Sequence, residues 1–179
     1  MCILDIVDGS ENGLSIRHPE SGGECLTVDG NYSGNKGYTS PCEYTFGLTP
    51  VYQRFRVLGG TVSGSNKFQS YYKWFATCIY TGSNYNDPVY TTSCDDSDGG
   101  NLSFRALAVT DRHPRVLIQQ VSIDRCLRKD GGDIRAVDCN EHDVQQHWIA
   151  CKAGDRGCEP VNEMAGKTDD PVNEGLDLM

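Results

Sequence analysis

Cysteine and histidine are the residue types in this chain best suited to hold a metal or to act as a nucleophile with its base. Both gather in the segment DCNEHDVQQHWIAC, residues 138–151. The chain nevertheless contains no C-x-x-C pair and no H-E-x-x-H run. Zinc ribbons, thioredoxin-like redox sites and zinc proteases need those spacings, because their groups must converge on one metal or one reactive thiol. The spacing therefore favours a structural role for this segment over a reactive or metal-binding one.

Acidic residues offer one other candidate for a metal site. The run CDDSDGGN, residues 94–101, superficially resembles a calcium loop with Asp95 at its first position. Ala106 then stands at the last position, where such a loop needs a glutamate that gives two oxygen ligands. The chain also lacks a G-x-S-x-G motif and a glycine-rich phosphate loop. We therefore expect no metal, no cofactor and no catalytic activity.

Charge and cysteine content narrow the compartment and the partners. The formal net charge is -9 and the pI is near 4.8, so nucleic acid would be repelled. Nine cysteines in 179 residues are typical of a disulfide-bonded secreted protein, although no signal peptide is visible at the start. We expect an extracellular protein or an ectodomain without membrane insertion, with a cytosolic protein carrying reduced cysteines as the alternative. The acidic segment 154–179 is expected to be a flexible tail.

The elements that position these residues repeat three times along the chain. Each unit has a cysteine, a turn rich in Gly, Asn and Asp, a second cysteine and then an aromatic residue. The units begin at Cys25, Cys78 and Cys126, so the period is about 50 residues. Frequent glycine turns leave room for four short strands per unit, and no segment shows a helical apolar period. The sequence predicts an all-β domain over 1–153. Its repeats are expected at about 15–58, 70–108 and 116–151.

Three four-stranded units resemble a β-trefoil, and the residues that close each unit make the resemblance more specific. The third unit ends with Q-H-W at 146–148, which resembles the Q-x-W motif of ricin-type (R-type) lectins. The first unit carries Q-R-F at 53–55, and the second carries L-S-F at 102–104. A cysteine soon after the motif, here Cys151, loosely resembles the cysteine-rich domain of mannose-receptor-like proteins. The chain is thus similar to β-trefoil lectin-like domains.

The resemblance implies structural roles for the motif and for the cysteines. The shared hydrophobic centre would be filled by Phe55, Phe104 and Trp148. The amides of Gln53 and Gln146 would bind backbone groups at a corner where strand pairing stops. Disulfides would staple the units as Cys25–Cys42, Cys78–Cys94 and Cys126–Cys139. A fourth bridge, Cys2–Cys151, would join the first and last strands, with Cys2–Cys158 as the alternative. One thiol would remain free or pair between chains.

The resemblance also allows the sugar-binding positions of galactose-specific repeats to be compared with this chain. Such repeats carry an Asp two residues after the first Cys, an aromatic residue two before the second, and an Asn just before Q-x-W. The Asp positions hold Thr27, Tyr80 and Arg128. The aromatic positions hold Ser40, Thr92 and Val137. The Asn positions hold Tyr52, Asn101 and Gln145. Only Asn101 matches, so we expect an eroded galactose site.

Other polar and aromatic residues could supply a sugar site of a different shape. Asp29 and Asp130 fall four residues after their cysteines, and each is either a shifted ligand or part of an Asp-Gly hairpin turn. A stacking surface could come from Tyr80, Tyr85 and Tyr90, with Asn101 as a polar contact. The sequence therefore predicts a non-catalytic lectin-like module that binds glycans or glycoproteins. The alternative is a cytokine-like or inhibitor-like β-trefoil that binds a protein receptor without binding sugar.

Overall fold

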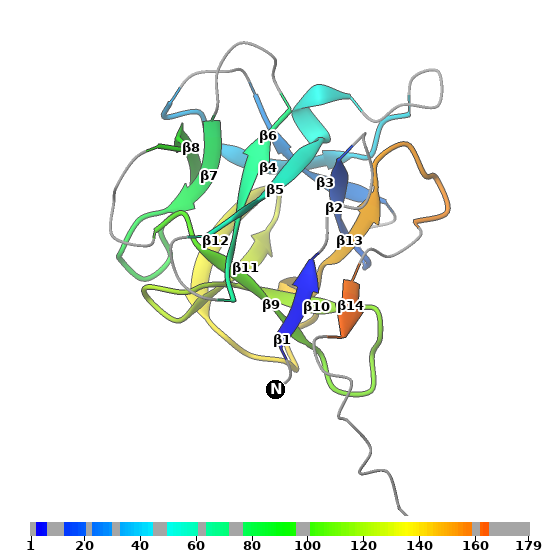
Figure 1. Cartoon of the computed structure of the whole chain (residues 1–179). Coiled ribbons are helices and arrows are strands. Elements are labelled where there is room, and N and C mark those ends of the chain that lie inside the picture. Colours follow the sequence, from blue (N-terminus) through cyan, green and yellow to red (C-terminus); the bar gives the residue numbers. More distant parts are fainter. Residues whose placement is uncertain are drawn as a thin grey trace, which may run out of the picture.

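The described part of the chain consists of short strands and the turns between them. The computed structural model describes residues 13–20, 23–29, 33–44, 50–60, 64–71, 77–95 and 101–158, together with the backbone of strands at 3–6 and 162–164. No described strand exceeds six residues, because glycine and asparagine turns interrupt the chain so often (Figure 1). Within these ranges no helix is long and apolar enough to span a bilayer.

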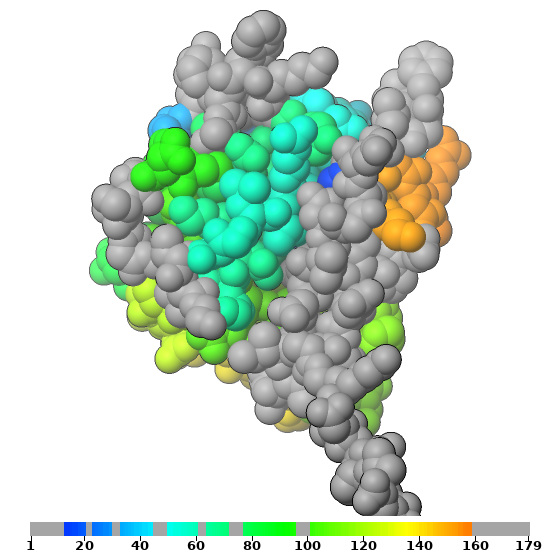
Figure 2. Space-filling model, in the orientation of Figure 1, coloured from blue at the N-terminus to red at the C-terminus, as the bar shows by residue number. Residues whose placement is uncertain are grey.

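Six strands form a closed barrel that uses the first and last strand of each repeat. They are β2 (Leu14–His18), β5 (Phe55–Gly59), β6 (Asn66–Ser70), β9 (Phe104–Ala108), β10 (Val116–Gln120) and β13 (Ile149–Lys152). The first five pair antiparallel with their neighbours in this order, and β13 pairs antiparallel with β2. Two backbone hydrogen bonds of 2.9 Å between Val116 and Trp148 join β10 to β13. In Figure 2, β5 and β6 form the centre of the visible face.

Three hairpins stand outside the barrel circuit, one from each repeat. They are β3 (Glu24–Val28) with β4 (Gly37–Pro41), β7 (Thr77–Thr81) with β8 (Val89–Ser93), and β11 (Arg125–Asp130) with β12 (Asp133–Asp138). Each hairpin meets the next through one backbone pair. The pairs are Tyr38 with Asp133, Lys36 with Tyr90, and Pro88 with Arg135. Because these pairs fall at equivalent positions of the repeats, the hairpins obey a threefold pseudo-symmetry.

This arrangement is a β-trefoil. The prediction of an all-β fold, built from three four-stranded repeats stapled by disulfides, is confirmed. The repeats span 14–59, 66–108 and 116–152.

Two further strands lie outside the threefold plan. β1 (Ile3–Ile6) pairs with β9 at Ala106 and Leu107, just past the point where β6 pairs with the same strand at Phe104. β14 (Asn162–Met164) pairs with β1 in turn. The segment 154–179, expected to be a flexible tail, thus supplies a strand in its described part. An open strand edge offers backbone hydrogen bonds to any extended segment, and composition alone does not reveal that.

The hydrophobic core lies inside the barrel and under the hairpins. Phe55, Phe104 and Trp148, the aromatic residues of the three motifs, are at most 1% exposed. Leu26 and Val28 of β3 belong to the same core cluster. Because side chains alternate along a strand, the residues between and beyond them project from the opposite, outer face of the hairpin. The outer faces of the hairpins are therefore distinct from the core that lies beneath them.

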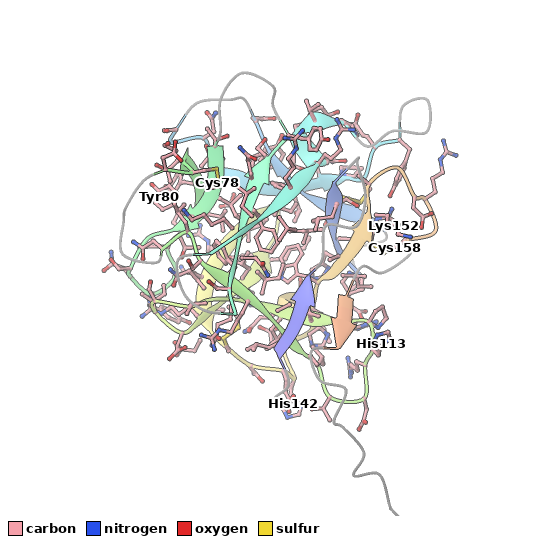
Figure 3. The ribbon with its side chains drawn as sticks, in the orientation of Figure 1. Cys78, Tyr80, His113, His142, Lys152 and Cys158 are labelled. Carbon is pink, nitrogen blue, oxygen red and sulfur yellow. A yellow bond between two sulfur atoms is a disulfide. The ribbon has the colours of Figure 1, made fainter. Side chains whose placement is uncertain are left out.

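Each repeat carries one disulfide, and a fourth closes a loop after the barrel. The bridges Cys25–Cys42, Cys78–Cys94 and Cys126–Cys139 have Cα–Cα separations of 5.0, 4.9 and 4.9 Å. The predicted bridge Cys2–Cys151 is wrong, because Cys151 pairs with Cys158. β13 runs beside β2, with Cys151 opposite Ser15, whereas β1 pairs with β9. The turn after β13 brings Cys158 back beside Lys152 (Figure 3). Cys2 lies outside the described residues.

Candidate functional site

Gln53 holds a structural corner of the first repeat. It ends the short 3-10 helix η1 (Val51–Gln53) and is fully buried. Its Oε1 accepts the backbone N–H of Glu43 at 2.9 Å, and its Nε2 donates to the carbonyl oxygen of Pro41 at 2.8 Å. The side chain thus satisfies backbone groups just past the end of β4, where strand pairing has stopped.

Gln146 makes the same two bonds in the third repeat. It ends η2 (Val144–Gln146) and is 2% exposed. Its Oε1 accepts the N–H of Asn140 at 3.0 Å, and its Nε2 donates to the carbonyl oxygen of Asp138 at 3.1 Å. The glutamines of both motifs therefore serve the fold and are turned away from any ligand.

The second repeat has Leu102 where the other two have glutamine. Leu102 is 2% exposed and packs in a cluster with Cys78 and Cys94. A leucine cannot accept a hydrogen bond, and the N–H of Asp95 donates to Ser93 Oγ at 3.3 Å instead. Ser93 thus accepts the backbone N–H whose equivalent in the other two repeats is accepted by the motif glutamine.

The usual sugar positions of the first repeat are filled by groups that bond to one another. Thr27, at the Asp position, is 1% exposed, and its Oγ1 lies 2.8 Å from Ser40 Oγ at the aromatic position. Gln53 Nε2 donates to the hydroxyls of Thr27 and Ser40, at 3.2 and 2.9 Å. This largely buried set of Thr27, Ser40 and Gln53 contains neither a carboxylate nor an aromatic ring.

Asp29 and Tyr38 place a carboxylate and a ring one step nearer the hairpin turn. Asp29 lies two residues beyond Thr27, and Tyr38 lies two residues before Ser40. Because β3 and β4 run antiparallel, both steps lead toward the turn and stay on the outer face. Tyr38 Oη donates to Asp29 Oδ1 at 2.7 Å. Asp29 is exposed, and its Oδ2 has no hydrogen-bond partner among the described residues.

Asp130 lies in the third hairpin, one strand further from Tyr38 than Asp133. It faces Asp133 across a Gly-Gly turn, and Asp133 faces Tyr38 across the junction of β12 and β4. Lys36 Nζ lies 2.7 Å from Asp133 Oδ1, and Arg135 Nε lies 3.3 Å from Asp130 Oδ2. The hydrogen bond from Lys36 holds the pKa of Asp133 below its usual value, and Arg135 adds to that effect. Asp130 is thus both a turn residue and part of a charged border beside Tyr38.

The second hairpin presents two tyrosine rings on its outer face. Tyr80 and Tyr90 are opposite one another in the strand register, with ring centroids 6.0 Å apart and planes inclined by 35°. Figure 3 shows Tyr80 on the outer rim of the molecule, on β7. Tyr90 is the threefold equivalent of Tyr38, so two of the three hairpins carry a tyrosine at this position.

A carboxylate also occurs beside these rings, although the strand itself supplies none. Gly82 is the threefold equivalent of Asp29 and Asp130. A Cβ built on Gly82 would overlap the carboxylate of Asp87, which therefore occupies the space of the missing side chain. Asn84 N–H donates to Asp87 Oδ2 at 2.8 Å and holds it there. The second hairpin thus combines a carboxylate with tyrosine rings, as the first hairpin does.

The third repeat has guanidinium groups in place of the rings. Arg128, at the Asp position, stands opposite Arg135, the equivalent of Tyr38 and Tyr90. Arg128 Nε lies 3.0 Å from Asp143 Oδ2, and Asp143 also caps η2 by accepting the N–H of Gln145. Each of these charges is already partnered within the protein. This repeat offers no combination of carboxylate and aromatic ring.

Tyr85 and Asn101 lie apart from the hairpin pairs. Tyr85 is 61% exposed, the largest exposure of a large hydrophobic side chain in the described ranges, and Arg125 of the third repeat lies 5.6 Å from its ring centroid. Asn101 Oδ1 accepts from Ser122 Oγ at 2.9 Å and from Gln120 Nε2 at 3.3 Å, at the turn after β10. The structure therefore distributes the six predicted ligand residues over several surfaces.

The described part of the chain contains no cluster of side chains suited to bind a metal, and its cysteines form disulfides. There, no group of three or more His, Cys, Asp and Glu side chains is arranged to hold a metal ion. Eight cysteines are joined in the four disulfides. What the described surface does offer is carboxylates beside tyrosine rings, a combination suited to polar ligands with an apolar face.

Comparison with known proteins agrees with this topology. No protein-family model and no curated protein sequence matches the chain. The designed threefold symmetric protein ThreeFoil matches with a TM-score of 0.62 and 15% identity, over 76% of this chain and 96% of that one. The Haemophilus ducreyi cytolethal distending toxin matches with a TM-score of 0.62 and 19% identity, over 82% and 88%. SeviL, bound to the asialo-GM1 saccharide, matches with a TM-score of 0.59 and 11% identity, over 79% and 98%. At these identities the likeness shows the fold alone, and it agrees with the strand topology: the chain is a β-trefoil.

Proposed function

We propose that the chain is a non-catalytic carbohydrate-binding module that holds sugars on the outer faces of its hairpins. The observation that carries this proposal is the pair of Asp29 and Tyr38, joined by a 2.7 Å hydrogen bond on an exposed face. A carboxylate accepts hydrogen bonds from sugar hydroxyls, and a tyrosine ring packs against the apolar face of a pyranose. Both groups that such recognition needs are present, although at shifted positions.

The surroundings of the pair add donors to these acceptors. Lys36, which directly precedes β4 of the same hairpin, borders the site and lies 2.7 Å from Asp133 Oδ1 of the neighbouring hairpin. Because carboxylates and an ammonium group lie at one edge of the ring, a ligand with several hydroxyls finds both acceptors and donors there. The shifted geometry implies that the preferred sugar need not be galactose.

Asp87 with Tyr80 and Tyr90 supplies a second surface of the same composition. Shallow sites of this kind bind weakly one at a time, and two of them on one domain raise the apparent affinity for a surface that carries many glycans. Likeness in fold to SeviL, which is bound to a saccharide, supports the same function. We therefore expect glycans or glycoproteins as partners.

We propose that the protein acts outside the cell. Four disulfides persist in an oxidising compartment and are rare in the cytosol. The net charge of -9 disfavours polyanions such as nucleic acid.

A glycan array with the fully oxidised protein, carrying neutral, sulfated and sialylated sugars, tests the proposal. We expect a reproducible signal that free sugar competes away. In Asp29→Asn one carboxylate oxygen stays as the acceptor for Tyr38, while the charge and the other oxygen are lost. Its affinity should fall by at least ~10-fold, since a hydrogen bond to a charged group contributes about 1.5–3 kcal/mol.

Asp111→Asn is the matched control, because Asp111 is also exposed and lies in the turn between β9 and β10, away from the hairpins. Equal loss in both variants, or none in either, would remove the first hairpin from the binding site. A blank array from protein shown to be folded would contradict sugar binding itself and favour the protein-binding β-trefoil.

A further inference from the structure

Two arginines meet one tyrosine on the barrel wall, away from the outer faces of the hairpins. Arg54 precedes β5 and Arg56 lies within it, and their guanidinium carbons are 3.9 and 4.2 Å from the ring centroid of Tyr71. Tyr71 follows β6, and its N–H donates to the carbonyl oxygen of Arg54 at 3.0 Å.

The fold holds the tyrosine ring in place. A Cβ built on Gly13 would come within 3.2 Å of Tyr71 Cε2 and would overlap the carbonyl oxygen of Phe55. Gly13 also has a φ of +75°, which side-chain-bearing residues rarely adopt. The Tyr71 ring therefore packs against the backbone at Gly13, which fixes its position. The guanidinium groups of Arg54 and Arg56 both contact this fixed ring.

Arg54 and Arg56 have no acidic partner among the described residues. Among the described residues, no Asp or Glu forms an ion pair with Arg54 or Arg56, in a protein whose net charge is -9. Arg54 Nε is buried and finds no hydrogen-bond partner there. Burial lowers the pKa of Arg54, and the charge of Arg56 lowers it further. Crowding two cations and burying an unpaired donor both cost free energy, which a bound anion would recover.

We propose that Arg54, Arg56 and Tyr71 form an oxyanion site that takes the sulfate or carboxylate group of an acidic saccharide. Sulfate and carboxylate oxygens match the planar fork of a guanidinium group, and two forks can share one oxyanion. The tyrosine ring stabilises the cations without neutralising them, so their charge stays available to the ligand. The oxyanion site stands on its own contacts. Only the sugar that carries the oxyanion rests on the proposed carbohydrate function.

Titration with sodium sulfate, at an ionic strength held constant with sodium chloride, tests the site directly. In ¹H–¹⁵N spectra of the arginine Nε–Hε groups, the signals of Arg54 and Arg56 should shift in a saturable way. Arg56→Gln, an exposed substitution, should weaken sulfate binding by at least ~10-fold, as expected when a charge-assisted hydrogen bond is lost. Arg112→Gln removes the same charge at an exposed turn residue and should bind sulfate as the unaltered chain does. Absence of selective shifts, or equal weakening in both variants, would overturn the proposal.

Three monosaccharide arms identify the source of the oxyanion. Sulfated galactose and N-acetylneuraminic acid carry the two oxyanions, and neutral galactose carries neither. We expect at least one acidic sugar to compete with sulfate, and Arg56→Gln to abolish that competition. Failure of both acidic sugars would overturn the saccharide assignment. Binding of neutral sugar depends on Asp29 and not on Arg56, so a failed lectin function would appear as lost neutral binding with the sulfate shifts intact.

Discussion

The indole N–H of Trp148 donates a 2.9 Å hydrogen bond to the carbonyl oxygen of Leu127. The largest buried side chain of the described residues thus belongs to the core and also links the barrel to the third hairpin through a hydrogen bond. Trp148→Ala should lower the free energy of unfolding by about 3–5 kcal/mol, because it leaves a large cavity. Trp148→Phe should cost less, about 1–3 kcal/mol, since it mainly leaves the Leu127 carbonyl without its donor. Urea denaturation monitored by circular dichroism measures both.

Phe55 and Phe104 stand at the equivalent positions of the other repeats, so a phenylalanine has a precedent there. Sugar binding by Trp148→Phe should therefore persist below its unfolding transition. A Trp148→Ala protein that is as stable as the unaltered chain but does not bind sugar would place Trp148 in the ligand site instead.

Gln53 can be replaced in a way that the second repeat already suggests. Gln53→Leu leaves the N–H of Glu43 and the carbonyl oxygen of Pro41 without partners, and should cost about 2 kcal/mol or more. The second repeat has Leu102 with Ser93, whose hydroxyl accepts the equivalent N–H. Adding Pro41→Ser to Gln53→Leu should therefore recover part of the lost stability, as a double-mutant cycle would measure. Strict additivity of the two substitutions would show that the serine does not replace the glutamine.

The repeat pattern could be predicted from the sequence because its signals are local. Each cysteine pair, glycine turn and closing aromatic residue lies within one unit, so spacing indicates three repeats, and the resemblance to R-type lectins implied the disulfide that staples each one. The fourth disulfide depends on how the chain turns after β13 and on which strand lies beside it. Spacing contains neither piece of information, and the expected pairing of Cys2 with Cys151 was wrong for that reason.

The ligand surface could be predicted only in part. Asp29 was visible because it follows a cysteine at a fixed distance, but its partner Tyr38 is set by the antiparallel register of β3 and β4. Asp87 stands in for a side chain at Gly82 only because the loop between β7 and β8 folds back. Such combinations arise from three-dimensional folding and leave no periodic trace in a single sequence.

The Cys151–Cys158 bridge should stabilise a loop that is docked on β2. Arg17 donates to the carbonyl oxygens of Asp155 and Arg156, and the bridge closes this loop over a sequence separation of 7. Replacing both cysteines by serine should cost about 2.5 kcal/mol in the loop-entropy model. Hydrogen exchange should rise in residues 152–158 and stay unchanged in the three hairpins. Peptide mapping of the oxidised protein that joined Cys2 to Cys151 would contradict the assignment.

His18 makes the stability of the fold depend on pH. Burial lowers the pKa of His18 below its ordinary value of 6.5, and the charge of Lys129 lowers it further. The unfolded chain then takes up the proton at a higher pH than the folded one does. The contribution of His18 to the free energy of unfolding is therefore complete above pH 6.5. It is lost as the pH falls through that value toward the pKa of His18 in the folded protein.

Each unit of pKa difference corresponds to about 1.4 kcal/mol, so urea denaturation on both sides of pH 6.5 should detect the slope. His18→Gln should flatten it, whereas His113→Gln, an exposed substitution, should leave it unchanged. The lowered pKa of Asp133 acts in a separate window, where stability falls as the pH drops below 3.8. A slope near pH 6.5 that survives in His18→Gln would assign the titration to another group.

Asp87 tests whether the second hairpin is a ligand surface in its own right. Because its carboxylate fills the place of a side chain at Gly82, Asp87→Ala removes the acceptor beside Tyr80 and Tyr90 while leaving both rings. Binding to a densely glycosylated surface should then weaken more than binding to a soluble monovalent sugar, since the loss of one of two sites reduces multivalency. Combining Asp87→Ala with Asp29→Asn should abolish binding to the glycosylated surface and binding to the soluble sugar. If the double variant bound the surface no more weakly than Asp29→Asn alone, the second hairpin would contribute nothing, and recognition would rest on the first hairpin by itself.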